Sequence, residues 1–121
     1  MHTLEIVLGE WISSGVKLDG ESLPVESILV DVTVGKATRV SLVGVERERF
    51  EENFPEWVEL IRPYVEFPGE SMLWPDSLAI NGKDLSLAYF DVRVVWGPGV
   101  AGSGRVFPER VVDGRIRWAG V

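Results

Sequence analysis

The side chains that most often carry out catalysis are scarce in this sequence. It has one histidine, His2, and no cysteine. We therefore regard three common sites as improbable: a Ser-His-Asp triad, a Cys-His pair and a histidine zinc site. The one histidine, His2, stands at an N-terminus that we expect to be mobile. Carboxylates are plentiful, but none forms a recognisable acid–base pair, and no alternating Asp or Asn pattern predicts a calcium loop. We predict no catalytic residue, no metal site and no cofactor. An enzyme here would depend on carboxylates, Lys, Arg, Tyr or Ser alone.

The glycine-rich stretch of residues 97–104 contains the one motif with a known ligand chemistry. Its sequence GPGVAG matches the G-x-G-x-x-G pattern of dinucleotide-binding turns. That chemistry requires a helix N-terminus behind the glycines to hold the phosphate, but the residues that follow, 105–108, are strand-like. We therefore interpret the stretch as a flexible loop between strands, of the kind that can close over a binding site. Its glycines are Gly97, Gly99, Gly102 and Gly104.

Residues 66–76 combine loop-forming residues with four large apolar side chains. Two prolines and a glycine in the sequence EFPGESMLWPD mark the stretch as a loop. Water does not favour apolar side chains on a free loop, so the loop either folds back as a lid on the core or presents an aromatic anchor to a partner. On the second hypothesis, the candidate partner-binding residues are Phe67, Met72, Leu73 and Trp74.

The C-terminal residues predict a hairpin that gathers three arginines. If Asp113-Gly114 forms a two-residue turn, Arg110 lies opposite Arg117 and Arg115 stands nearby. Opposed like charges destabilise a sheet. Either water or nearby acidic residues screen Arg110, Arg115 and Arg117, or these arginines bind an anion or an acidic patch of a partner. Pro108 predicts that the hairpin lies at a sheet edge, because proline cannot donate to a central ladder.

Strand patterns dominate the rest of the sequence. Apolar residues that alternate or run together predict strands over residues 4–8, 11–18, 28–34, 38–45, 77–80, 84–96, 105–112 and 115–119. Asp19-Gly20 and Asn81-Gly82 are typical of tight hairpin turns. A three-residue loop, 35–37, would place Val32 opposite Val40. A change of apolar phase within residues 84–96 indicates a β-bulge near Tyr89-Phe90.

One stretch has helical periodicity. The apolar side chains that recur on a single helical face are Phe50, Phe54, Trp57, Val58 and Ile61. Proline disrupts a helix interior but suits its first turn, so the spacing predicts a helix that starts near Pro55 and ends before Pro63. The preceding residues, 46–53, could form a short helix or continue the previous strand.

These elements show no β-α-β rhythm. They predict an α+β fold that is predominantly antiparallel β, arranged as a curled sheet, a sandwich or a partial barrel, with one main helix near residues 55–62. The length of 121 residues suits a single domain, residues 1–121.

Charge is distributed unevenly along the chain. Residues 1–60 hold 12 acidic and 5 basic side chains, whereas residues 61–121 hold 7 of each, so the first half carries the whole net charge of −7. This distribution argues against nucleic-acid binding, which needs a basic surface, and would suit a basic partner. No stretch has the pattern of a signal peptide or approaches the roughly 20 apolar residues of a membrane span. We expect a cytoplasmic protein without membrane or nucleic-acid partners.

These features favour a small acidic protein-binding module, for instance an inhibitor or an immunity-type protein that masks a basic partner. That class rests on an analogy in size and charge. One alternative is a small-ligand-binding domain or an enzyme, with a pocket between the sheet and the helix. Another alternative is a structural subunit that joins a larger assembly through strand edges. The sequence does not indicate an oligomeric state.

Overall fold

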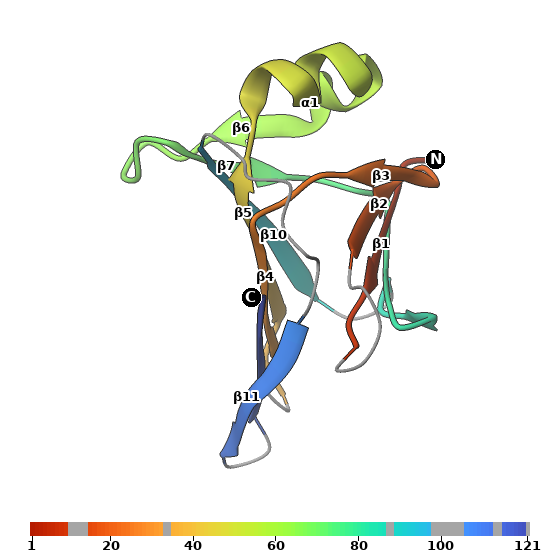
Figure 1. The fold of residues 1–121 in the computed structure, drawn as a ribbon, viewed down its shortest axis with the longest axis vertical. Coiled ribbons are helices and arrows are strands. Elements are labelled where there is room, and N and C mark those ends of the chain that lie inside the picture. The colour runs from red at the N-terminus through yellow and green to blue at the C-terminus, as the bar shows by residue number, and fades with distance from the viewer. Residues whose placement is uncertain (10–14, 33–34, 87–88, 98–105, 113–114, 121) are drawn as a thin grey trace.

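The strands of the chain form two sheets. The computed structural model describes residues 1–9, 15–32, 35–86, 89–97, 106–112 and 115–120 (Figure 1). In spatial order, the first sheet contains β3 (Glu21–Leu23), β2 (Gly15–Leu18), β1 (Thr3–Val7), β8 (Ser77–Ile80) and β9 (Lys83–Asp84). The second sheet contains β11 (Val106–Val112), β12 (Arg115–Gly120), β4 (Ser27–Val32), β5 (Thr38–Val45), β10 (Phe90–Trp96), β7 (Glu70–Leu73) and β6 (Ile61–Pro63).

Most neighbouring strands in these sheets are antiparallel. Among the described strands, β1 with β8 and β5 with β10 are the parallel pairs. The prediction of an α+β fold with predominantly antiparallel sheets is therefore confirmed, and each sheet is mixed. Figure 1 shows the two sheets at an angle to each other, with the helical segment across one end.

Both sheets contribute to one hydrophobic core. Leu4 and Ile6 of the first sheet are buried in the same cluster as Val40 and Leu42 of the second. In each strand the residues between these buried positions face away from the core, because successive side chains of a strand point to opposite sides. The period-two pattern of the sequence therefore identified the buried faces correctly.

A helix lies at the predicted position, from Pro55 to before Pro63, but it is a 3₁₀ helix, and residues 47–53 form a short α-helix rather than continuing the previous strand. The α-helix, α1, covers Arg47–Asn53, and a 3₁₀ helix, η1, covers Pro55–Leu60. Pro55 separates the two because it has no N–H to continue the α-helix, whereas it fits the first turn of a new helix. The predicted helix near residues 55–62 is thus a 3₁₀ helix that ends where β6 begins. No helix among the described residues is long and apolar enough to cross a membrane.

The 3₁₀ geometry also changes which side chains are buried. Phe50, Phe54 and Trp57 lie in the core, as predicted, but Val58 is 41% exposed. A 3₁₀ helix has three residues per turn, so residues three apart share a face and Val58 turns outward from the face of Phe54 and Trp57.

The two predicted turns of the first sheet are confirmed. Asp19 and Gly20 both have positive φ values, 51° and 84°, and Leu18 pairs with Glu21. Asn81 and Gly82 likewise have φ values of 50° and 78°. This conformation matches the twist of the flanking strands and is easily adopted by Asp, Asn and Gly.

The register of β4 with β5 differs from the prediction by two residues. Val30, not Val32, lies opposite Val40, and Ile28 lies opposite Leu42. The connection from Val32 to the start of β5 at Thr38 is longer than the loop that the sequence favoured. Because a shift of two residues preserves the alternation of faces, Val30 and Val40 still both face the core, where they are buried.

The predicted strand over residues 84–96 is two strands in different sheets. β9 ends at Asp84 in the first sheet, and β10 begins at Phe90 in the second. The apolar phase change near Tyr89-Phe90 therefore marks the passage between sheets rather than a β-bulge. The predicted loop over residues 66–76 is wrong in part as well, because β7 forms within it and pairs with β10.

The C-terminal hairpin has the predicted register at its closed end. Arg110 lies opposite Arg117 and Val112 lies opposite Arg115, and β11 forms a sheet edge as Pro108 indicated. The register shifts between Pro108 and Arg110. The turn at residues 113–114 lies outside the described residues.

Gly44 allows a bulge within the second sheet, and this leads to a first prediction. The pairing of β5 with β10 shifts register beside Gly44, whose φ is +76°, and a Cβ atom there would lie 2.3 Å from the Cβ of Glu26. We predict that Gly44→Ala lowers the free energy of unfolding by about 2–5 kcal/mol, through backbone strain and steric overlap. Urea denaturation would measure the loss.

Gly82→Ala is the matched control for this substitution. Gly82 has a similar φ of +78°, but the space around its Cβ position is open. It should lose only the backbone contribution, about 1–2 kcal/mol. Equal losses in the two variants would contradict the role assigned to the contact with Glu26.

Candidate functional site

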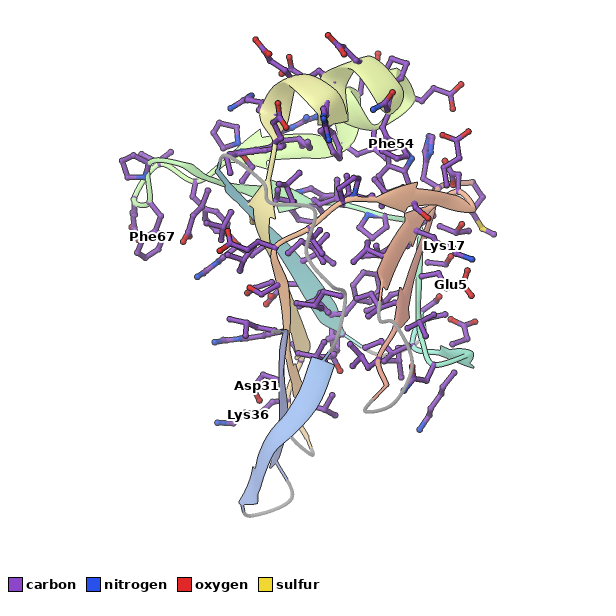
Figure 2. All side chains as sticks on the ribbon, in the orientation of Figure 1. Glu5, Lys17, Asp31, Lys36, Phe54 and Phe67 are labelled. Carbon is purple, nitrogen blue, oxygen red and sulfur yellow. The ribbon has the colours of Figure 1, made fainter. Side chains whose placement is uncertain are left out.

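The outer face of the second sheet carries the side chains that β7 and β10 turn away from the core. Leu73 and Val92 pair across these strands and are buried. The next pair, Met72 with Arg93, therefore faces outward. In Figure 2 the labelled Phe67 also points away from the first sheet. The first sheet lies on the inner side and the helical segment at one end, so no described helix or sheet covers this outer face (Figure 1).

A pocket of about 290 Å³ lies where β7 ends and β10 begins. Its lining includes the buried Leu73 and Val92, with Met72, Trp74 and Tyr89 beside them. β7 leads on to β8 of the first sheet, and β10 follows β9 of the same sheet. The two segments therefore separate beyond the Leu73–Val92 pair, and the pocket lies between them. Most of the lining surface is apolar.

The rings around this pocket are unusually accessible. Trp74 is 59% exposed and Tyr89 is 88% exposed, whereas Trp57 in the core is 2% exposed. Phe90 and Asp91 complete the lining next to Tyr89. Exposed large apolar side chains that surround a pocket are typical of interaction sites.

The structure brings together most of the predicted partner-binding residues. Met72, Leu73 and Trp74 all line the pocket, where Leu73 is buried and Trp74 is exposed. Phe67 lies in the connection from β6 to β7 and is 47% exposed. It packs edge to face against Tyr64, with 6.0 Å between the ring centroids.

Arg93 joins Phe67 to the sheet. Its guanidinium lies 5.1 Å from the ring centroid of Tyr64 and 5.5 Å from that of Phe67. Its Nε atom also lies 3.5 Å from a carboxylate oxygen of Glu70. These contacts hold the connection between β6 and β7 beside the outer face.

Sequence reasoning did not identify Tyr89, Phe90 or Asp91 as site residues. The phase change at Tyr89-Phe90 was visible, but it was interpreted as a bulge within one strand. Asp91 forms an ion pair with Arg39 of β5, with 3.7 Å between Arg39 Nε and Asp91 Oδ2. The Arg39 side chain is 73% exposed and that of Asp91 is 49% exposed, and ion pairs so exposed to water contribute little to stability.

The two other predicted sites fall largely outside the described side chains. For the arginine hairpin, the backbone register places Asp31 of β4 opposite Arg117, which is the kind of nearby acidic residue expected to offset the arginines. The anion site at Arg110, Arg115 and Arg117 stays a prediction. In the glycine stretch, the N–H of Gly97 donates to the carbonyl of Val45 at 3.0 Å. Gly99, Gly102 and Gly104 lie outside the described residues.

A second group of polar contacts centres on the Asp19 carboxylate. It accepts hydrogen bonds from the N–H of Thr3 at 2.8 Å and from Nε1 of Trp57 at 2.9 Å. Nδ1 of His2 lies 3.0 Å from the same oxygen that Trp57 contacts. His2 was expected to be mobile, but its N–H also donates to Asp76 at 2.8 Å and its carbonyl accepts from the N–H of Asp76 at 2.8 Å.

These contacts lower the pKa of Asp19. Partial desolvation is the largest single effect and acts to raise it, but the hydrogen bonds from Thr3, His2 and Trp57, together with the charge of His2, outweigh desolvation. The pKa therefore lies below the ordinary value of 3.8. The ionised carboxylate is the form that the fold stabilises.

An acidic pocket adjoins Asp19. It has a volume of about 200 Å³ and lies between the β2–β3 turn and η1, beside Phe54 and Trp57. Its polar lining residues are Asp19, Glu21, Asn53 and Glu56. Among the described residues, no ion pair joins these three carboxylates to a lysine or an arginine.

His2, Asp19 and Glu56 are the described residues whose arrangement could hold a metal ion. One ligand atom from each lies within 4.8 Å of the others. Asp19, however, already accepts hydrogen bonds from Thr3 and Trp57. A metal ion would have to compete with these donors for the same oxygens.

The chain has no match among protein family models, curated proteins or solved structures. The function must therefore be inferred from the geometry of the chain itself.

The pKa of Asp19 leads to a prediction about the pH dependence of stability. Because the folded pKa is lowered, the stabilisation is complete above the ordinary value of 3.8 and is lost as the pH falls through the folded value. Asp19→Asn should lower the free energy of unfolding at neutral pH by about 1–2 kcal/mol, an amount limited by the partial exposure of the side chain. The difference from the wild type should narrow below pH 3.8 in urea denaturation.

Glu21→Gln serves as the control for this measurement. Glu21 is an exposed residue of the same pocket, and its backbone pairs with Leu18, but its side chain has no hydrogen bond or ion pair with another described residue. It should change stability by no more than about 0.5 kcal/mol at either pH. A loss as large as that of Asp19→Asn would show that net charge, not hydrogen bonding, is responsible.

Because Thr3 and Trp57 already donate hydrogen bonds to the Asp19 carboxylate, we keep the prediction that the chain has no transition-metal site. Adding excess zinc should leave the melting temperature unchanged, because an ion that binds only the folded state would raise it. A zinc-dependent rise that disappears in His2→Ala would overturn this prediction.

Proposed function

We propose that this chain is a protein-binding module, and that the apolar pocket between the end of β7 and the start of β10 receives a side chain of a protein partner. The exposure of Trp74 and Tyr89 around an apolar pocket carries the proposal. A partner that covered these rings would remove their apolar surface from water, and aromatic residues in such positions are often binding hot spots.

Charge supports a basic partner for this module. The helical segment from Glu46 to Leu60 holds six glutamates and two arginines. Both arginines, Arg47 and Arg49, already pair with neighbouring glutamates of the same segment. The remaining negative charge would attract a basic surface and accelerate its association.

The described strand edges give less support to assembly through strand pairing. β3, β6 and β9 each have three residues or fewer, and β6 contains Pro63. β11 is longer but contains Pro108. Short edges and edge prolines are features that oppose pairing with another chain.

The alternative of a small-ligand-binding domain or an enzyme rests on the acidic pocket between the β2–β3 turn and η1. Its carboxylates have no described lysine, tyrosine or serine beside them in the lining. Asp19 there is also ionised by its hydrogen bonds and is therefore unsuited to act as a general acid. The protein-binding proposal is therefore the better supported one.

Truncation of Trp74 tests the proposal. Proteins captured by the immobilised wild-type chain would be identified, and their affinity measured by calorimetry with each variant. Trp74→Ala should weaken binding by about 2 kcal/mol or more, close to 30-fold, with little change in melting temperature because the ring is mostly exposed.

Val58→Ala is the matched control, since Val58 is an exposed apolar residue that does not line the pocket. It should leave the affinity unchanged. If Trp74→Ala binds every captured protein as tightly as the wild type does, the pocket is not the binding site. A large fall in its melting temperature would instead place Trp74 in the core.

A further inference from the structure

The apolar pocket between the end of β7 and the start of β10 combines aromatic rings with one carboxylate. Trp74, Tyr89 and Phe90 supply the rings, and Asp91 is the acidic residue of the lining. The face of an aromatic ring carries partial negative charge and attracts cations, and a nearby carboxylate attracts the same cation by its own charge. Met72 provides an apolar wall that suits the hydrocarbon part of a long side chain.

The described arginines leave these rings uncovered. Arg47 lies 5.0 Å from the ring centroid of Trp96, and Arg93 lies over Tyr64 and Phe67. Among the described residues, no arginine or aromatic ring makes such a contact with Trp74 or Tyr89. The chain thus uses arginine–aromatic contacts within its own fold but leaves the rings of the pocket available.

We infer that the pocket binds an arginine side chain of the partner, with its guanidinium against the rings of Trp74 and Tyr89 and paired with Asp91. This inference rests on the proposed protein-binding function and specifies the residue that is recognised. Arginine fits better than lysine, because a planar guanidinium stacks on aromatic rings and can bond both oxygens of a carboxylate. A purely apolar side chain would instead desolvate Asp91 without itself offering the carboxylate a hydrogen-bond donor.

Arg39 competes for the same carboxylate. Its Nε atom lies 3.7 Å from Asp91 Oδ2, which is beyond direct hydrogen-bond distance, and its side chain is 73% exposed. Asp91 therefore keeps acceptor capacity for a second guanidinium. Removal of Arg39 should strengthen arginine binding, whereas removal of the Asp91 charge should weaken it. These opposite expectations separate recognition by Asp91 from a general effect of mutation.

Titration with small probes tests the inference on the full chain. The indole N–H signal of Trp74 in a ¹H–¹⁵N spectrum can be assigned by its loss in Trp74→Phe. We expect N-acetyl-arginine amide to shift this signal saturably, and to bind about threefold to fivefold more tightly than the uncharged isostere N-acetyl-citrulline amide. N-acetyl-norleucine amide, which has an apolar side chain, should also bind more weakly than the arginine probe.

The variants should then change the affinity in opposite directions. Asp91→Asn should reduce the affinity for the arginine probe to that for the citrulline probe, and Arg39→Gln should raise it about twofold to threefold. Glu5→Gln is the charge-matched control, because Glu5 projects from the first sheet on the other side of the molecule (Figure 2). It should leave the affinity unchanged.

Two results would overturn the inference. One is tighter or equal binding of the norleucine probe with no effect of Asp91→Asn, which would make the pocket a site for an apolar side chain and leave the proposed function intact. The other is the absence of any shift of the Trp74 signal by the arginine probe up to its solubility limit. Failure of the proposed function is recognised separately, by unchanged partner binding in Trp74→Ala.

Discussion

The Asp19 carboxylate joins three parts of the chain that are far apart in sequence. It lies in the turn between β2 and β3, and it bonds to Thr3 at the start of β1 and to Trp57 in η1. Trp57 is also one of the largest fully buried side chains of the core. A tryptophan N–H at such a position needs an acceptor, and an ionised carboxylate is a strong one. The helical segment is thereby attached to the end of the first sheet, where it covers the core.

The position of the pocket depends on where the chain passes between its two sheets. The chain leaves β7 for β8 through residues 74–76, and it returns from β9 to β10 through residues 85–89. Where two segments separate at the end of a paired ladder, their backbones no longer hydrogen-bond to each other, and a space opens between them. The aromatic residues at the points of separation, Trp74 and Tyr89, therefore border a pocket. The candidate site is a consequence of how the sheets are connected.

The sequence correctly predicted those features that depend on the backbone preferences of neighbouring residues. Tight turns at Asp19-Gly20 and Asn81-Gly82 follow from the backbone conformations that these residues tolerate. Features that depend on pairing between distant segments were not predictable: β7 forms in a stretch rich in loop residues because β10 offers it a neighbouring ladder. The residues of the candidate site also differ in how far the sequence could predict them. Trp74 was recognisable as an apolar residue among loop residues, whereas Tyr89 and Asp91 join it only through the pairing of β7 with β10.

The backbone that carries Trp74 is held on both sides of its exposed ring. The Trp74 N–H donates to the carbonyl of Leu60 at 3.0 Å, Pro75 is buried, and the N–H of Asp76 donates to the carbonyl of His2 at 2.8 Å. A ring on a fixed backbone loses little conformational freedom when a partner covers it, so more of the contact energy contributes to affinity. His2 in turn contacts Asp19. The hydrogen bonds that attach the helical segment to the first sheet are thus continuous with those that support the aromatic wall of the pocket.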